Sequence, residues 1–127
     1  MNNFHKNYEV NTPIILKTYE FYKIFYQYLE LFPKKDKYAL GAKCEEYISA
    51  ILEILLEANY LPKEEKLLLI MKANNKFEVL KIFIRMLKDL NIIDQKKYIF
   101  LQTAVQEIGR MFGGWLKSLN RLEKPSY

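Results

Sequence analysis

Apolar side chains recur along this chain at alternating intervals of three and four residues, the spacing of one face of a helix. Near the C-terminus the series is Tyr98, Leu101, Val105, Ile108, Phe112, Trp115, Leu119 and Leu122. Earlier series are Leu40, Cys44, Tyr47, Ile51, Ile54 and Ala58, then Ile70, Ala73, Phe77, Leu80, Ile84 and Leu87. The pattern predicts amphipathic helices that share one core.

Prolines and capping residues divide this pattern into four helices. Thr12 can cap a helix that has Pro13 at its first position, and Pro33 ends that helix. Pro62 opens the third helix, and Asp94 can cap the fourth. We expect helices over about 12–32, 35–59, 62–91 and 94–121, with a frayed tail at 122–127.

The expected loops are too short to cross the length of the helices, so consecutive helices must be antiparallel. A chain of 127 residues that is 50% hydrophobic and has few glycines and prolines suits one helical domain. The sequence therefore predicts an all-α, up-down-up-down four-helix bundle that occupies residues 1–127 as a single domain.

The formal charge of +5 is concentrated in the second half of the chain. Residues 1–71 carry nine Lys/Arg and ten Asp/Glu, whereas residues 72–127 carry eleven and five. Cations recur at helical spacing in two rows: Lys81, Arg85 and Lys88, then Arg110, Lys117 and Arg121. We expect these rows to contact nucleic-acid phosphate; the alternative is ordinary solubilising charge.

Two features suggest protein interfaces. Aromatic residues surround the first helix, more than one core can bury, so Tyr19, Tyr22 and Tyr26 are candidate contacts. A tyrosine-rich wet surface is the alternative. Gly113 and Gly114 lie inside the fourth helix at a cost of about 1 kcal/mol each, which close approach by another molecule, or by a helix of the same chain, would offset.

Catalytic, metal-binding and membrane-spanning signals are weak. The single histidine, His5, lies near the N-terminus, and Cys44 falls on an apolar seam, which predicts a buried, inert thiol. Glu107 is expected to pair with Arg110 three residues on. We expect a protein that is not an enzyme and has no metal or cofactor. With no apolar run of about 20 residues and no signal peptide, we expect it to be cytoplasmic and to have no membrane partner.

Three segments carry a family resemblance. They are Phe32-Pro-Lys-Lys-Asp-Lys-Tyr38, Leu80-Lys-Ile-Phe-Ile-Arg-Met-Leu87 and Glu107-Ile-Gly-Arg-Met-Phe-Gly-Gly-Trp-Leu-Lys117. Over about residues 13–121 the chain resembles the Avd family, the accessory variability determinants of diversity-generating retroelements. That family is related to the four-helix-bundle proteins encoded in ribosomal RNA intervening sequences.

The resemblance implies a ring-like homo-pentamer without catalytic activity, which associates with a reverse transcriptase and its structured template RNA in mutagenic retrohoming. By position, Arg85 and Arg110 match arginines of the family pattern, and Lys117 and Arg121 match its basic C-terminal helix. Lys34, Lys35 and Lys37 fall in the basic loop after the family's proline. The alternative is a bundle of the intervening-sequence type that acts only as a protein-interaction or structural module.

Overall fold

The computed structural model of the chain describes residues 12–123, with side chains described through residue 120. Within this range the chain forms helices and no strand. They are α2 (Pro13–Leu29), α3 (Lys34–Lys37), α4 (Leu40–Ala58), α5 (Lys63–Asp89) and α6 (Gln95–Glu123). Most of the tail expected at 122–127 lies outside the described residues.

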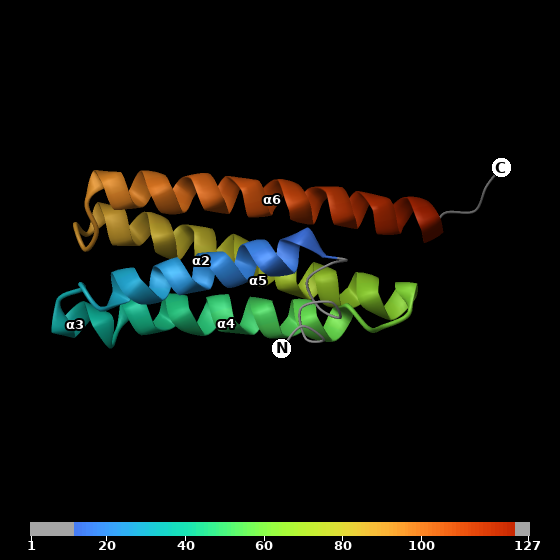
Figure 1. Ribbon diagram of the computed structural model, residues 1–127, viewed down its shortest axis with the longest axis horizontal. Coiled ribbons are helices and arrows are strands. Elements are labelled where there is room, and N and C mark those ends of the chain that lie inside the picture. Colours follow the sequence, from blue (N-terminus) through green and yellow to red (C-terminus); the bar gives the residue numbers. More distant parts are fainter. Residues whose placement is uncertain (1–11, 124–127) are drawn as a thin grey trace.

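The four long helices form an antiparallel bundle with up-down-up-down topology (Figure 1). α4 packs against both α2 and α5, and α6 packs against both α5 and α2. The helices that follow one another along the chain are therefore also neighbours in space. This closed arrangement confirms the predicted four-helix fold.

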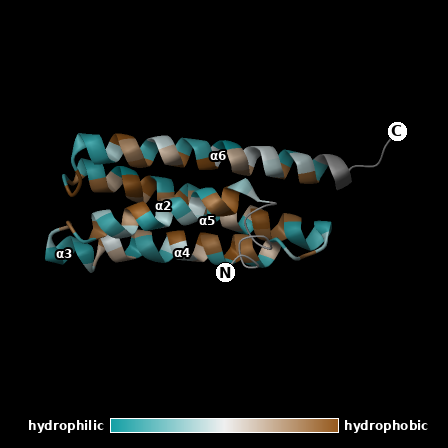
Figure 2. Ribbon diagram, in the orientation of Figure 1, coloured by the Kyte–Doolittle hydropathy of each residue, from teal (hydrophilic) through white to brown (hydrophobic). Residues whose placement is uncertain are grey.

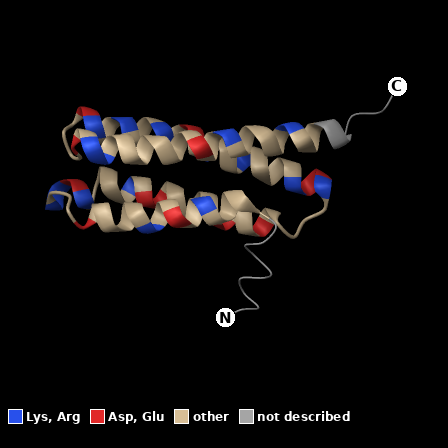
Figure 3. Cartoon of the chain, turned by 45° about the horizontal axis from the view of Figure 1, so that its top comes forward, with Lys and Arg blue, Asp and Glu red and all other residues tan. Residues whose placement is uncertain are grey.

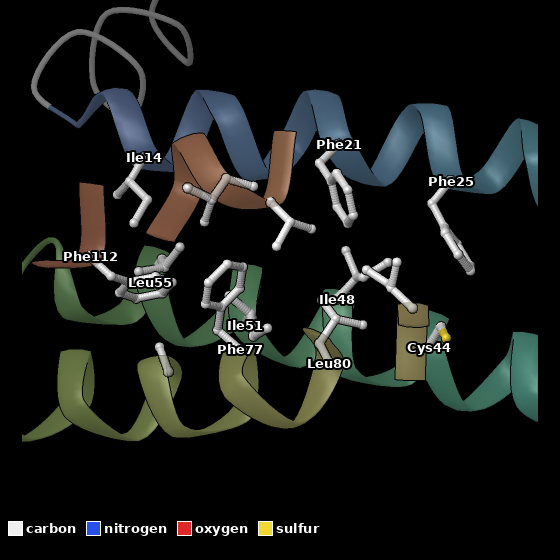
Figure 4. Close-up of a cluster of buried hydrophobic side chains, with 14 of the residues drawn as sticks. Ile14, Phe21, Phe25, Cys44, Ile48, Ile51, Leu55, Phe77, Leu80 and Phe112 are labelled. Atoms are coloured by element: carbon white, nitrogen blue, oxygen red, sulfur yellow. The ribbon is translucent and has the colours of Figure 1, made fainter. Parts of the chain in front are cut away.

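One core runs through the bundle, and every long helix contributes to it. Figure 4 shows Phe21 of α2 and Ile48 of α4 pointing toward Leu80 of α5, and Phe112 of α6 entering from the side. All six residues of the α5 series predicted from the sequence are buried, and so are Leu101, Val105, Ile108, Phe112 and Leu119 of α6. Each long helix contains both hydrophobic and hydrophilic segments (Figure 2), as expected of helices that bury one face and expose the other.

The helix expected over 35–59 is instead two helices, α3 and α4, separated by a break at Tyr38 and Ala39. The backbone of Ala39 has φ −112° and ψ −101°, outside the helical region. Gly41 follows the break and is buried against the end of α2, where an added Cβ would lie 2.5 Å from Cδ1 of Leu29. The chain turns sharply to bring α4 back along α2, and this close approach leaves little room for a side chain at residue 41.

The expected helix ends are largely as observed, with two differences. α2 stops at Leu29, short of the expected residue 32, because i to i+3 hydrogen bonds tighten the chain into a turn before Pro33. Thr12 occupies the N-cap position of α2, but its hydroxyl donates to Oδ1 of Asn59 at 2.7 Å instead of capping the helix. This bond ties the start of α2 to the end of α4.

The turn between α5 and α6 follows standard capping chemistry. Asn91 has φ 60°, and the backbone N–H of Ile92 donates to the carbonyl of Leu87 at 2.8 Å, as in a Schellman motif. The backbone N–H of Lys97 donates to Oδ1 of Asp94 at 2.8 Å, which confirms the expected N-cap. This hydrogen bond makes the largest contribution to lowering the pKa of Asp94 below its ordinary value. These capping hydrogen bonds shape the turn that places α6 beside α5.

Candidate nucleic-acid interface

A groove of about 670 Å³ lies between α5 and α6. Its lining consists of Glu78, Lys81, Ile82, Arg85, Tyr98, Gln102, Val105, Gln106, Gly109 and Arg110. The fold therefore brings Lys81 and Arg85 of one predicted cationic row to the same groove as Arg110 of the other. Gln102 and Gln106 add amide groups that can donate or accept hydrogen bonds.

The two α5 cations in the groove each have a carboxylate partner on their own helix. Lys81 Nζ lies 3.0 Å from Oε1 of Glu78, and Arg85 Nε donates to Oδ1 of Asp89 at 3.1 Å. The Asp89 bond raises the pKa of Arg85 further above its ordinary value. These pairs are exposed, so they hold the cations in place without removing them from solvent.

Arg110 differs from both, because it is exposed and forms no ion pair with any residue whose side chain is described. The sequence-based expectation that Arg110 pairs with Glu107 is wrong. Glu107 Oε2 instead lies 3.1 Å from Nζ of Lys17 on α2. Glu107 points toward the α2 side of α6, whereas Arg110 lines the groove on the α5 side.

The remaining cations of the two rows whose side chains are described do not line the groove. Lys88 Nζ lies 4.9 Å from the ring centroid of Tyr98, which does line it. Lys117 is exposed on α6, two turns beyond Arg110. Arg121 lies on the helical backbone of α6, but its side chain is outside the described residues. Lys and Arg recur along the bundle with Asp and Glu between them (Figure 3).

The tyrosines proposed as protein contacts occupy different environments. Tyr19 and Tyr26 are exposed, with 46% and 55% of their surface accessible. Tyr22 is half-buried, and its hydroxyl donates to Oε2 of Glu45 at 3.2 Å, which links α2 to α4. Burial, and then the charge of Glu45, raise the pKa of Tyr22. Tyr19 and Tyr26 are therefore the more accessible of the three.

The glycines of α6 also fall into two groups. A Cβ at Gly109 would lie 3.5 Å from Cε2 of Phe77, an ordinary contact with α5. Gly113 and Gly114 are exposed, and an added Cβ would meet nothing within 4 Å. Close packing inside the described part of the chain therefore does not account for these two glycines.

The described residues contain little that resembles a catalytic or metal site. Cys44 is fully buried, which confirms the expected burial, and this burial raises the pKa of its thiol to about 12. Within the same range no group of three or more His, Cys, Asp or Glu side chains could hold a metal ion. No described helix is both long enough and apolar enough to cross a membrane. His5 lies outside the described residues.

A family model described as bAvd-like matches residues 14–119, which is most of the chain and includes both cationic rows up to Lys117. The chain therefore belongs to the bAvd-like family, which confirms the resemblance drawn from its sequence. This family is one of accessory proteins. No curated protein matches the chain.

Proposed function

We propose that this chain is a non-catalytic accessory protein of a diversity-generating retroelement, and that it binds the reverse transcriptase and the structured template RNA in the cytoplasm during mutagenic retrohoming. Membership of the bAvd-like family supports this role. We further propose that residues 1–127 act as one domain and assemble into a ring-like homo-pentamer, as the family resemblance implies.

The α5–α6 groove is the proposed RNA-contact surface, and Arg110 carries the argument. A guanidinium that lines a groove without a carboxylate partner among the described side chains can form charge-assisted hydrogen bonds to phosphate. Lys81 and Arg85 supply cations on the opposite wall. Lys88 lies beside Tyr98, and Lys117 is 19 residues further along α6, so these two lysines extend the row to a length of about 28 Å at 1.5 Å rise per residue.

Such a surface recognises backbone charge and shape more than base sequence. Lysine and arginine side chains on a convex bundle reach phosphates, and Gln102 and Gln106 are the side-chain amides that line the groove. We therefore expect affinity for structured RNA that falls steeply with salt concentration.

The test is a pair of double charge reversals with matched change in net charge. Lys81→Glu with Arg110→Glu alters the groove, whereas Lys23→Glu with Lys43→Glu alters α2 and α4. Binding of labelled structured RNA at fixed ionic strength should be lost in the groove variant and largely kept in the control. Equal loss in both variants would contradict a localised site.

A protein-interaction module of the ribosomal RNA intervening-sequence type is the second candidate. The observation in its favour is that Glu78 and Asp89 offset the charges of Lys81 and Arg85 within the groove. This candidate predicts negligible RNA binding at physiological salt and loss of assembly when exposed Tyr19 or Tyr26 is replaced by a polar residue.

A further inference from the structure

A second groove, of about 440 Å³, lies where α2, α3 and α4 meet. Its lining consists of Tyr26, Leu29, Glu30, Lys37, Tyr38, Ala42 and Glu45. This is the end of the bundle at which the chain leaves α2, passes through α3 and returns along α4 (Figure 1). The groove combines aromatic rings, carboxylates and an ammonium group, and it shares no residue with the α5–α6 groove.

Two exposed tyrosine rings line this groove. The exposed fractions are 71% for Tyr38 and 55% for Tyr26. The side chain of Tyr38 has no hydrogen-bond or ring partner among the described residues. Unpaired nucleic-acid bases stack on exposed aromatic side chains of this kind. The groove therefore offers a surface on which a flat base can stack.

Two carboxylates supply hydrogen-bond acceptors to the same groove. Oε2 of Glu45 accepts from the hydroxyl of Tyr22 at 3.2 Å, which orients the carboxylate and leaves its second oxygen for a ligand. Neither Glu30 nor Glu45 forms an ion pair with any side chain that the structure describes. Because an ionised carboxylate only accepts hydrogen bonds, the ligand must present N–H groups.

Guanine matches these acceptors better than the other RNA bases. Its Watson–Crick edge has two adjacent donors, N1–H and the N2 amino group, which one carboxylate can accept together. Adenine and cytosine place a single amino group next to an acceptor nitrogen, and uracil places one N–H between two carbonyl groups. Those acceptors would face the carboxylate and repel it.

The lysines of α3 lie beside the two carboxylates. Lys37 lines the groove, and Lys34 and Lys35 are exposed on the same short helix. None of the three forms an ion pair with a described side chain. Asp36, Glu30 and Glu45 balance them in number, so the site has separated charges and not a net charge. A ligand with a donor edge and an anionic backbone would be complementary to both signs.

We propose that the groove beside α3 binds an unpaired guanine nucleotide of RNA. The base stacks on Tyr38, its N1–H and N2 amino group donate to a groove carboxylate, and the adjoining phosphates lie beside the α3 lysines. This inference rests on the proposed function, because it names the part of an RNA that the chain reads. It adds base recognition to the phosphate contacts assigned to the α5–α6 groove.

Two other ligands agree less well with the groove. Tyrosine rings and carboxylates also attract an arginine or lysine of a partner protein. Such a cation would be repelled by Lys37, which lines the groove, and by Lys34 and Lys35 beside it. A free guanine nucleotide offers the same base, but it lacks the phosphates on both sides that a strand brings to the lysines.

The test uses the full chain and short labelled oligouridine RNAs with one central base that varies. The central base is guanine, hypoxanthine, adenine, cytosine or uracil, and affinity is measured by fluorescence anisotropy at low salt. Hypoxanthine differs from guanine only in lacking the N2 amino group. The wild-type protein should bind the guanine probe at least about fivefold more tightly than the hypoxanthine probe, the lower end for a bidentate pair. Equal affinity for these two probes would overturn the proposal.

The acceptors are tested by Glu30→Gln with Glu45→Gln. The loss of two negative charges should raise affinity for the all-uridine probe, while the preference for guanine over hypoxanthine falls to twofold or less. Glu53→Gln with Glu57→Gln is the control, because it changes the net charge equally at two exposed α4 positions outside the groove. The control should keep the guanine preference, and a preference that survives in the groove variant would contradict the assignment.

The stacking ring is tested by Tyr38→Ala, with circular dichroism to verify the helix content. Affinity for the guanine probe should fall at least about fivefold, the lower end for loss of one stacked base. Tyr38→Phe keeps a ring and should stay within twofold of wild type. Phe100→Ala, which removes a half-exposed ring on α6, should do the same. Wild-type affinity in Tyr38→Ala would count against the site.

Competition separates the remaining ligands. Displacement of the guanine probe by an equal concentration of a short arginine peptide, or of guanosine monophosphate, would show that the groove takes a protein cation or a free nucleotide, and would overturn the inference. Absence of a guanine preference, with structured-RNA binding that still depends on Arg110, would overturn this inference alone. Absence of binding to every RNA would overturn the proposed function as well.

Discussion

Glu107 of α6 pairs with Lys17 of α2, with Nζ and Oε2 3.1 Å apart. The contact joins the last helix of the bundle to the first and draws the carboxylate away from the α5 side of α6. Arg110, one turn further along α6, is consequently left without this partner. The two residues expected to neutralise each other lie beside different grooves.

Replacing Glu107 with glutamine should therefore leave RNA binding nearly unchanged. Because the Lys17 pair is partly exposed, the substitution should lower the free energy of unfolding by less than about 1 kcal/mol. Urea denaturation and RNA titration of Glu107→Gln measure the two effects. A clear gain in RNA affinity would show that Glu107 restrains Arg110 after all.

Replacing Glu78, in contrast, should strengthen RNA binding. Glu78 lines the cationic groove and pairs with Lys81, so Glu78→Gln removes a negative charge from the groove and releases a cation. We expect affinity to rise by up to about fivefold, the effect of one exposed ion pair. Glu78→Gln and Glu107→Gln have the same net charge, so a rise in RNA affinity in Glu78→Gln alone is an effect of charge inside the groove and not of net charge.

Gly113 and Gly114 test whether assembly depends on close approach to α6. Alanine at either position meets no atom within 4 Å, so helix propensity should raise the free energy of unfolding by up to about 1 kcal/mol per substitution. If another subunit or partner contacts this site closely, the same substitutions should weaken assembly. Chemical denaturation and sedimentation velocity of Gly113→Ala with Gly114→Ala would reveal this combination. Greater stability with unchanged assembly would remove both glycines from the interface.

Cys44 should be unreactive in the folded protein. Burial raises its thiol pKa from 9.0 to about 12, so the nucleophilic thiolate is almost absent at neutral pH. Its contribution to stability is complete below about pH 9 and declines as the pH rises toward 12, because the unfolded thiol ionises first. Labelling by a thiol reagent at pH 8 should follow global unfolding. Rapid labelling without denaturant would contradict the described burial.

The rings of Phe77 on α5 and Phe112 on α6 pack against each other in the core. Their ring centroids are 5.3 Å apart, and both side chains are buried. Phe112→Ala should lower the free energy of unfolding by about 3–5 kcal/mol, through lost transfer energy and the cavity left behind. Phe100→Ala is the control: Phe100 is half exposed on the same helix, so this substitution should lower the free energy of unfolding by much less.

The helical period alone predicted most of the bundle, because burial in this fold follows one stripe per helix. The α5 and α6 series show this, since Ile70, Phe77, Leu101 and Phe112 are buried as expected. Sequence did not reveal that α4 begins at Leu40, because the break depends on how closely Gly41 approaches Leu29 of α2. A contact between separate helices leaves no local periodic signal.

The same distinction applies to the candidate sites. The rows of Lys81 with Arg85 and of Arg110 were visible in the sequence, but their meeting in one groove depends on the packing of α5 against α6. The predicted partner of Glu107 was wrong for the same reason, since its observed partner, Lys17, lies 90 residues away along the chain. The groove beside α3 was missed, because its lining comes from three separate helices and leaves no periodic signal in the sequence.

The most direct test of the RNA-binding account is the salt dependence of RNA affinity for the wild-type protein and for Arg110→Glu. If the groove binds phosphate, the wild-type affinity should fall steeply and linearly on logarithmic axes as salt increases. Arg110→Glu should bind more weakly, with a shallower slope because fewer counterions are released. Identical affinity and slope for the two proteins, or no RNA binding by the wild type even at low salt, would contradict the assignment of the α5–α6 groove.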